Sequence, residues 1–124
     1  MQMITINCGV EFLYDSGRMI GAEIDVSSVP EIATVVFDCL LEGKLKGILL
    51  KGRDKKHSVI LCNGNNAICE GNPMEIHLSR SDCEIIRNLL LNVFIGDCFP
   101  GYHFDVCLNL NGQETEVCFL LKQL

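Results

Sequence analysis

The sequence of 124 residues lacks any long hydrophobic run. Its longest apolar runs, such as Leu89-Leu90-Leu91, fall far below the roughly 20 residues that a membrane helix needs. The residues from Met1 to Asn7 have neither the basic nor the apolar stretch of a secretory signal. We therefore expect no membrane partner and a cytoplasmic location.

The chain also lacks a Pro/Ser-rich linker and any low-complexity tract. Hydrophobic residues make up 48% of it, which argues against disorder. A chain of this length fits one domain and buries roughly two thirds of its unfolded surface. Its core therefore needs no disulfide or metal ion to be stable. The sequence predicts a single domain spanning residues 1–124.

The recognisable motifs of catalysis and cofactor binding are missing. The chain contains no phosphate-binding loop, serine nucleophile elbow, H-E-x-x-H motif or acidic metal loop, and its glycine spacings do not support dinucleotide binding. We predict no catalytic residues, no cofactor and no enzyme activity.

The eight cysteines include no C-x-x-C pair. Without a secretory signal, we expect reduced and mostly buried thiols that act as small hydrophobes; a redox or disulfide role is the alternative. The histidines at positions 57, 77 and 103 lie far from any cysteine pair in sequence, so no metal site is predicted.

The net charge of −6 is unevenly distributed. Residues 44–56 hold six basic residues and one acid, a net charge of +5, whereas residues 1–43 carry −6 and residues 57–124 carry −5. A mostly acidic surface repels nucleic acid and attracts a basic partner. We therefore expect a protein partner with a basic surface and no nucleic acid.

Alternating apolar residues and turn signals predict a series of short strands. The expected strands and hairpins are a strand at 3–7, a hairpin of 10–14 with 19–26, a hairpin of 46–51 with 58–62 around a basic turn at 52–57, and strands at 67–69 and 74–78.

Two helices are indicated by capping-box spacing and a helical stripe of apolar residues. Ser28 with Glu31 begins the first helix, which Gly43 ends; Ser81 with Glu84 begins the second, which Gly96 ends. The expected apolar stripes are Val29, Ile32, Ala33, Val36, Phe37, Leu40 and Leu41 on the first helix, and Ile85, Ile86, Leu89, Leu90, Val93 and Phe94 on the second.

The last hairpin is the best specified element, because Asn111-Gly112 favours a two-residue type I′ turn. That turn sets the register. The expected pairs are Leu110 with Gln113, Leu108 with Thr115, Val106 with Val117, Phe104 with Phe119, and Tyr102 with Leu121. The fold class is predicted to be α+β: a mainly antiparallel sheet built from hairpins, with both amphipathic helices packed on one face.

The opposite face of this hairpin is polar. It carries three carboxylates, Asp105, Glu114 and Glu116, together with Asn109. We predict that these residues bind a basic partner, with ordinary solvation as the alternative. Loops on rigid scaffolds carry function, and residues Asn65, Asn66 and Glu70 of the loop region 63–73 are added to the predicted partner-binding set.

The same face also holds His103, Asp105 and Cys107 at alternate positions of one strand. These are the residue types of a cysteine nucleophile with its base. Adjacent same-face positions on a strand are about 7 Å apart, too far for a direct thiol–imidazole bond without convergence. An exposed polar sheet face is the simpler interpretation.

Several apolar residues lie off the two helical stripes. They are Val35 and Cys39 on the first helix and Leu91 and Ile95 on the second. Apolar surface beyond one face indicates either deep burial or contact with another chain. A homodimer or a protein partner is the hypothesis that follows.

In size, acidity and α+β build, with its acidic hairpin at Asp105, Glu114 and Glu116, the chain resembles bacterial immunity proteins. The resemblance implies an inhibitor that occludes a cognate basic toxin domain, often a nuclease, through charge matching. Two alternatives remain: a small cysteine-dependent enzyme or ligand-binding protein, and a structural subunit of a larger assembly.

Overall fold

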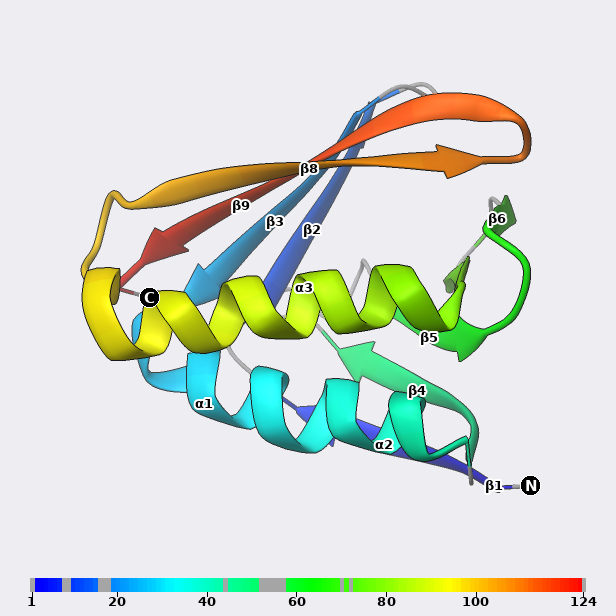
Figure 1. Ribbon diagram of the computed structural model, residues 1–124, viewed down its shortest axis with the longest axis horizontal. Helices are drawn as coiled ribbons and strands as arrows, with labels where there is room; N and C mark the ends of the chain where they lie inside the picture. Colours follow the sequence, from blue (N-terminus) through cyan, green and yellow to red (C-terminus); the bar gives the residue numbers. More distant parts are fainter. Residues whose placement is uncertain are drawn as a thin grey trace.

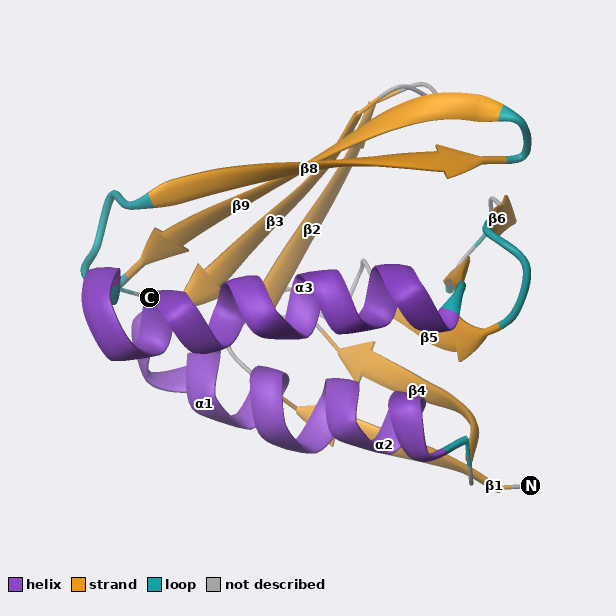
Figure 2. Cartoon of the chain, in the orientation of Figure 1, coloured by secondary structure: helices purple, strands orange, loops and turns teal. Residues whose placement is uncertain are grey.

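The computed structural model describes residues 2–7, 10–15, 19–43, 45–51, 58–69, 71 and 73–123. Figures 1 and 2 show how their helices and strands are arranged. In chain order the elements are β1 (Gln2–Asn7), β2 (Val10–Asp15), β3 (Met19–Asp25), the 3-10 turn η1 (Val26–Ser28), α1 (Val29–Glu31), the π-helical η2 (Ile32–Val36), α2 (Phe37–Glu42), β4 (Leu45–Lys51), β5 (Ser58–Asn63), β6 (Ala67–Cys69), β7 (Met74–Leu78), α3 (Arg80–Asn92), the π-helical η3 (Val93–Asp97), β8 (His103–Leu110) and β9 (Gln113–Lys122). The predicted α+β class is confirmed; the basic turn at 52–57 lies outside the described residues.

The strands form two sheets, whereas the sequence predicted one. The five-stranded sheet has the order β1-β4-β5-β7-β6, and the four-stranded sheet has the order β2-β3-β9-β8. The predicted hairpins β2–β3, β4–β5 and β8–β9 are all present and antiparallel, as is the pair β6–β7. Three parallel pairs, β1–β4, β5–β7 and β3–β9, complete the sheets. Hairpins were predictable because their pairing is local, but alternation does not say which distant strand lies beside which.

The register of the last hairpin is confirmed. Leu110 pairs with Gln113, Leu108 with Thr115, and so on to Phe104 with Phe119. Asn111 and Gly112 both have positive φ, 55° and 74°, as a type I′ turn requires. Just before β8 begins, the N–H of Leu121 donates to the Tyr102 carbonyl at 2.8 Å, which keeps these two residues opposite one another as predicted.

The first helical segment, η1 to α2, buries the predicted stripe from Val29 to Leu40. Ser28 makes no capping hydrogen bond; the Asp25 carboxylate instead accepts from the Ser27 N–H at 3.2 Å and begins η1. Gly43, at a φ of 70°, ends the segment as predicted, in the left-handed conformation that glycine adopts without strain.

The second helix, α3, begins earlier than predicted. The Ser79 hydroxyl accepts from the Asp82 N–H at 3.3 Å, so Ser79, not Ser81, is the N-cap. Both serines precede an acid by three residues, and the sequence spacing alone could not choose between them. The helix continues through η3 past Gly96, which was expected to end it. Among the described residues, no helix is both long and apolar enough to cross a membrane.

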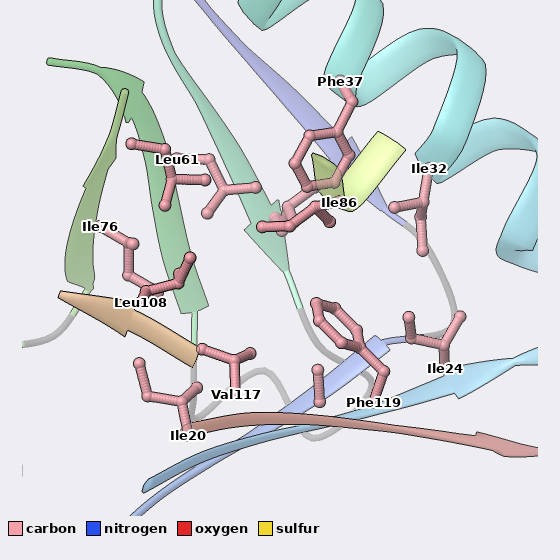
Figure 3. Close-up of a pocket in the computed structure, with 13 residues that line it drawn as sticks. Ile20, Ile24, Ile32, Phe37, Leu61, Ile76, Ile86, Leu108, Val117 and Phe119 are labelled. Carbon is pink, nitrogen blue, oxygen red and sulfur yellow. The ribbon is translucent and has the colours of Figure 1, made fainter. Parts of the chain in front are cut away.

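A single cluster of buried side chains joins the two sheets and the helices. Figure 1 shows α3 running beside α1 and α2 across the space between the sheets. At the centre, Phe37 and Ile86 from the helices approach Phe119 from one sheet and Leu61 from the other (Figure 3). These side chains line an entirely apolar cavity of about 50 Å³. A void this small and apolar has no group with which to orient a ligand.

Candidate functional site

The outer face of the four-stranded sheet brings together most of the predicted partner-binding residues. On β8, Asp105, Cys107 and Asn109 are exposed, while the intervening residues Val106 and Leu108 are buried. Across the hairpin, their register partners on β9 are Cys118, Glu116 and Glu114. We call the carboxylates Asp105, Glu114 and Glu116 the acidic triad.

Two carboxylates of the acidic triad, Asp105 and Glu116, lie close together, and no cation of the described residues pairs with the triad. The ligand atoms of Asp105, Glu116 and Cys118 all lie within 4.8 Å of one another. Within the described part of the chain, no Lys, Arg or His lies within ion-pair distance of the triad. Farther along the same face, by contrast, Glu23 on β3 forms an ion pair with Lys122 on β9. Like charges held close together cost stability, and within the described ranges no cation offsets that cost at the triad.

The two thiols that lie among the carboxylates of the triad, Cys107 and Cys118, have raised pKa values. The pKa of Cys118 is raised to about 12 by desolvation, by a hydrogen bond to Asp105, and by the negative charges of Asp105 and Glu116. The pKa of Cys107 is also raised, by desolvation and then by the charges of Glu114 and Glu116. An activated cysteine needs a lowered pKa, so the electrostatics of this face oppose nucleophilic chemistry.

His103, Asp105 and Cys107 do share the exposed face, as their alternate positions predicted. The hydrogen bonds and charges that act on Cys107 come from the carboxylates, and His103 is not among their sources. The strand therefore displays the three residue types side by side without pairing the thiol to a base.

The tip of the β8–β9 hairpin is fastened to the five-stranded sheet. The Asn111 side chain accepts from the Ile68 N–H at 3.2 Å and donates to the Ile68 carbonyl at 2.9 Å, as a neighbouring strand would. The Asn111 N–H also donates to the Asn66 carbonyl at 3.2 Å. In Figure 1 the tip accordingly lies beside β6. Nothing in the sequence beyond the turn signal marked Asn111 for this contact.

The predicted loop residues divide into different roles. The Asn66 side chain accepts from the Ser79 N–H at 2.7 Å and donates to Asp82 at 2.6 Å, which ties the loop to the start of α3. Its amide is therefore occupied within the domain. Asn65 is exposed next to the fastened hairpin tip, whereas Glu70 lies outside the described residues.

The four off-stripe residues are not deeply buried. Val35 is 42% exposed and Ile95 is 82% exposed, whereas Cys39 and Leu91 are half-buried. Phe94 and Phe99, each about half exposed, lie near Ile95 in the sequence. This apolar surface at the end of α3 is the second surface that is available to another chain.

The cysteines form no disulfide among the described residues. Cys62 and Cys83 are buried as expected, but Cys69 and Cys107 are exposed and the other three are half-buried. The expectation of mostly buried thiols was therefore only partly right, because strand alternation places Cys107 on the solvent side of its sheet.

Two groups of side chains have the composition of a cation site. One is Asp105, Glu116 and Cys118 on the acidic face, in which the raised pKa keeps the thiol protonated at neutral pH. The other is Cys62, Glu75 and His77 on the outer face of the five-stranded sheet. Because the second group combines sulfur, nitrogen and oxygen donors, it has the donor set that zinc prefers.

Comparison with known proteins adds no relative. No protein-family model matches the chain, and no curated protein sequence matches it. What is established is therefore the class of fold: an α+β domain in which two sheets and two helical segments share one core.

Proposed function

We propose that this chain is an acidic protein-binding domain that acts as an inhibitor of the immunity-protein type, occluding a cognate toxin domain with a basic surface. The observation that supports it is the acidic triad: three carboxylates on one sheet face with no cation within ion-pair distance among the described residues. Lys and Arg side chains of a partner would neutralise this charge. Carboxylates that oppose the phosphate-binding cations of a nuclease would block its substrate by steric and charge occlusion.

The triad suits rapid association. The Debye length at physiological salt is about 8 Å, so charges as close as those of Asp105 and Glu116 act on an approaching partner as a unit. The net charge of the chain, −6, has the same sign and extends the attraction beyond the patch. We expect association that is fast at low salt and slows steeply as salt is added.

The hairpin is also held in place. The hydrogen bonds between Asn111 and Ile68 hold the hairpin that carries the triad against the five-stranded sheet before a partner binds. A surface that is already ordered loses less conformational entropy on binding. Asn109 and Asn65, both exposed beside this tip, extend the proposed binding surface. We place the action in the bacterial cytoplasm, where free thiols are the norm.

The cysteine-dependent enzyme is the weaker alternative. Its nucleophile would be Cys107, whose pKa is raised rather than lowered, by desolvation and then by the carboxylates around it. The structural-subunit alternative differs from the proposal in one measurable property: a permanent assembly is held by apolar contacts and resists salt.

The test is an affinity pull-down from the native cells with three baits, followed by mass spectrometry. The baits are the wild type, Glu114→Lys/Glu116→Lys, and the control Glu31→Lys/Asp97→Lys. The control makes the same charge change at two exposed carboxylates that lie outside the triad and form none of the observed ion pairs.

We expect the wild type and the control to retain a basic protein that the triad variant loses, with affinity reduced by about tenfold or more in the binding assay that follows. The recovered protein should block growth when expressed alone and be neutralised by this chain. Equal recovery of one partner by all three baits would discard the triad as the binding surface. A partner that is retained at high salt, and is harmless alone, would favour the structural subunit.

A further inference from the structure

The outer face of the five-stranded sheet holds a side-chain cluster that the proposed function does not use. Strands β5 and β7 run parallel, and their register places Cys62 directly beside His77. Glu75, two residues before His77 on β7, points to the same side of the sheet because strand side chains alternate. One ligand atom from each of Cys62, Glu75 and His77 lies within 4.8 Å of the other two. We call these residues the β5–β7 cluster.

We propose that the β5–β7 cluster binds a divalent metal ion of the zinc type, with the Cys62 sulfur, a Glu75 carboxylate oxygen and a His77 ring nitrogen as its protein ligands. These are the three donor types of biological zinc sites. The inference is independent of the acidic face and would hold if the proposed function failed.

The spacing of the cluster fits a tetrahedral ion after a small adjustment. His77 Nε2 lies 3.9 Å from Glu75 Oε1. Nitrogen and oxygen ligands of a tetrahedral zinc ion, each about 2.0–2.2 Å from the metal, are about 3.3–3.6 Å apart. The side chains of Glu75 and His77 are 45% and 31% exposed, so they have the rotamer freedom to close that difference.

The cluster is buried on one side and open to solvent on the other. Cys62 is only 6% exposed and forms the floor, whereas the half-exposed Glu75 and His77 leave a route from solvent. Three protein ligands would fill three of four tetrahedral positions and leave the fourth for water.

Two glycines give the ligands their space. A Cβ at Gly47 would lie 3.1 Å from the Cys62 sulfur, and a Cβ at Gly64 would lie 3.2 Å from His77 Nδ1. Side chains at these positions would press on the sulfur and on the imidazole ring. Glycine at both positions leaves room for the Cys62 sulfur and the His77 ring.

This cluster could not be recognised in the sequence, because Cys62 and His77 are 15 positions apart and the three residues match no short zinc motif. Only the parallel pairing of β5 with β7, which skips over β6, brings sulfur and imidazole into register. Parallel register cannot be read from a turn, unlike the register of a hairpin.

Metal titration of the reduced, metal-free protein tests the proposal. Co²⁺ is the spectroscopic probe, because a thiolate bound to tetrahedral cobalt gives a charge-transfer band and intense visible bands, and Zn²⁺ is then added to displace it. We expect one Co²⁺ per chain with the spectrum of a single sulfur ligand. Zinc should bleach that spectrum and raise the Tm of the wild type.

The variants are Cys62→Ser, His77→Gln and Glu75→Gln, each of which removes one ligand with little change of volume. The matched controls are Cys69→Ser, an exposed cysteine on the neighbouring strand β6, and Cys118→Ser on the acidic face. Each ligand variant should weaken zinc binding by at least about tenfold, since even outer-shell changes at zinc sites cost 10–100-fold. Both controls should bind as the wild type does.

Circular dichroism of each metal-free variant shows whether it folds. If Cys62→Ser fails to fold, the decision passes to Glu75→Gln, because Glu75 is 45% exposed and its change to an amide disturbs no packing. Full zinc affinity in folded Glu75→Gln and His77→Gln overturns the proposal. So does a cobalt spectrum that lacks sulfur-to-metal charge transfer, or one that Cys69→Ser or Cys118→Ser abolishes.

Discussion

At the scale of single residues, the chemistry of each thiol is decided by its neighbours. Desolvation, and then the carboxylates around them, hold the pKa values of Cys107 and Cys118 high. Cys62 lies beside an imidazole and one carboxylate, in a group with the donors of a metal ion. The cysteines of the two outer faces thus have different neighbours, although the sequence gives no sign of the difference.

The residue-scale prediction concerns alkylation. Although Cys107 is exposed, its raised pKa leaves less thiolate at pH 8, so it should react with iodoacetamide more slowly than glutathione does. The variant Glu114→Gln/Glu116→Gln removes two of the raising charges and should speed the reaction several-fold. Peptide mass spectrometry over a time course measures both rates.

The pH dependence of the alkylation rate is a second test of the raised pKa of Cys107. Below its pKa, the rate at Cys107 should rise about tenfold per pH unit and continue to rise past pH 9, the ordinary value of a cysteine pKa. A rate for Cys107 that already exceeds that of glutathione at pH 7 would contradict the raised pKa and restore the cysteine-dependent enzyme as a candidate.

At the scale of elements, local signals placed the helices but not their first residues. Ser81 with Glu84 has the spacing of a capping box, yet Ser79 with Asp82 has a cap of the same spacing two residues earlier. Ser79 is held in position by the Asn66 side chain, which accepts from its N–H. A tertiary contact therefore accompanies the cap that the helix uses.

The element-scale prediction separates the two serines. Ser79→Ala removes the acceptor of the Asp82 N–H and should lower the free energy of unfolding by about 1 kcal/mol. Ser81→Ala, one position into the helix, should change it by less than about 0.5 kcal/mol. Urea denaturation of both variants measures the difference. The larger loss in Ser81→Ala would mean that the helix begins where the sequence alone had placed it.

At the scale of the whole molecule, two sheets share one core and are linked at the hairpin tip. The core residues lining the cavity come from both sheets and both helical segments, so neither sheet can bury its apolar face without the other. Asn111 adds a polar link by pairing its side chain with the backbone of Ile68 on β6. The Asn111 side chain thereby hydrogen-bonds to the edge strand of the five-stranded sheet and links it to the four-stranded sheet.

The whole-molecule prediction uses Asn111→Gly. Glycine keeps the positive φ that the turn requires, so the change removes only the two hydrogen bonds to Ile68. We expect a loss of about 1–3 kcal/mol in the free energy of unfolding and faster hydrogen exchange at the Ile68 amide. Asn109→Ala, exposed on the same hairpin, is the control and should be nearly neutral. Unchanged exchange at Ile68 in Asn111→Gly would show that the link does not hold the sheets together.

The candidate acidic face was predictable to a large degree. One two-residue turn sets the register of β8 and β9, and alternation then assigns Asp105, Glu114 and Glu116 to the polar face. What the sequence could not supply was the absence of a neutralising cation, since that depends on which strands lie alongside. The pairing of β3 with β9 places Glu23 beside Lys122 and no cation beside the triad among the described residues.

The sequence by itself determined the α+β class, the hairpins, the apolar stripe of the first helix and the face on which the acidic triad lies. Each of these depends on residues close together in the chain, where periodicity and turn geometry leave few choices. On the second helix, Ile85 and Phe94 were expected in the buried stripe but are about half exposed. Only the tertiary structure decided that the strands divide into two sheets and that Asn111 links them. It alone put Cys62 beside His77, because parallel pairs join strands whose partner no local pattern specifies.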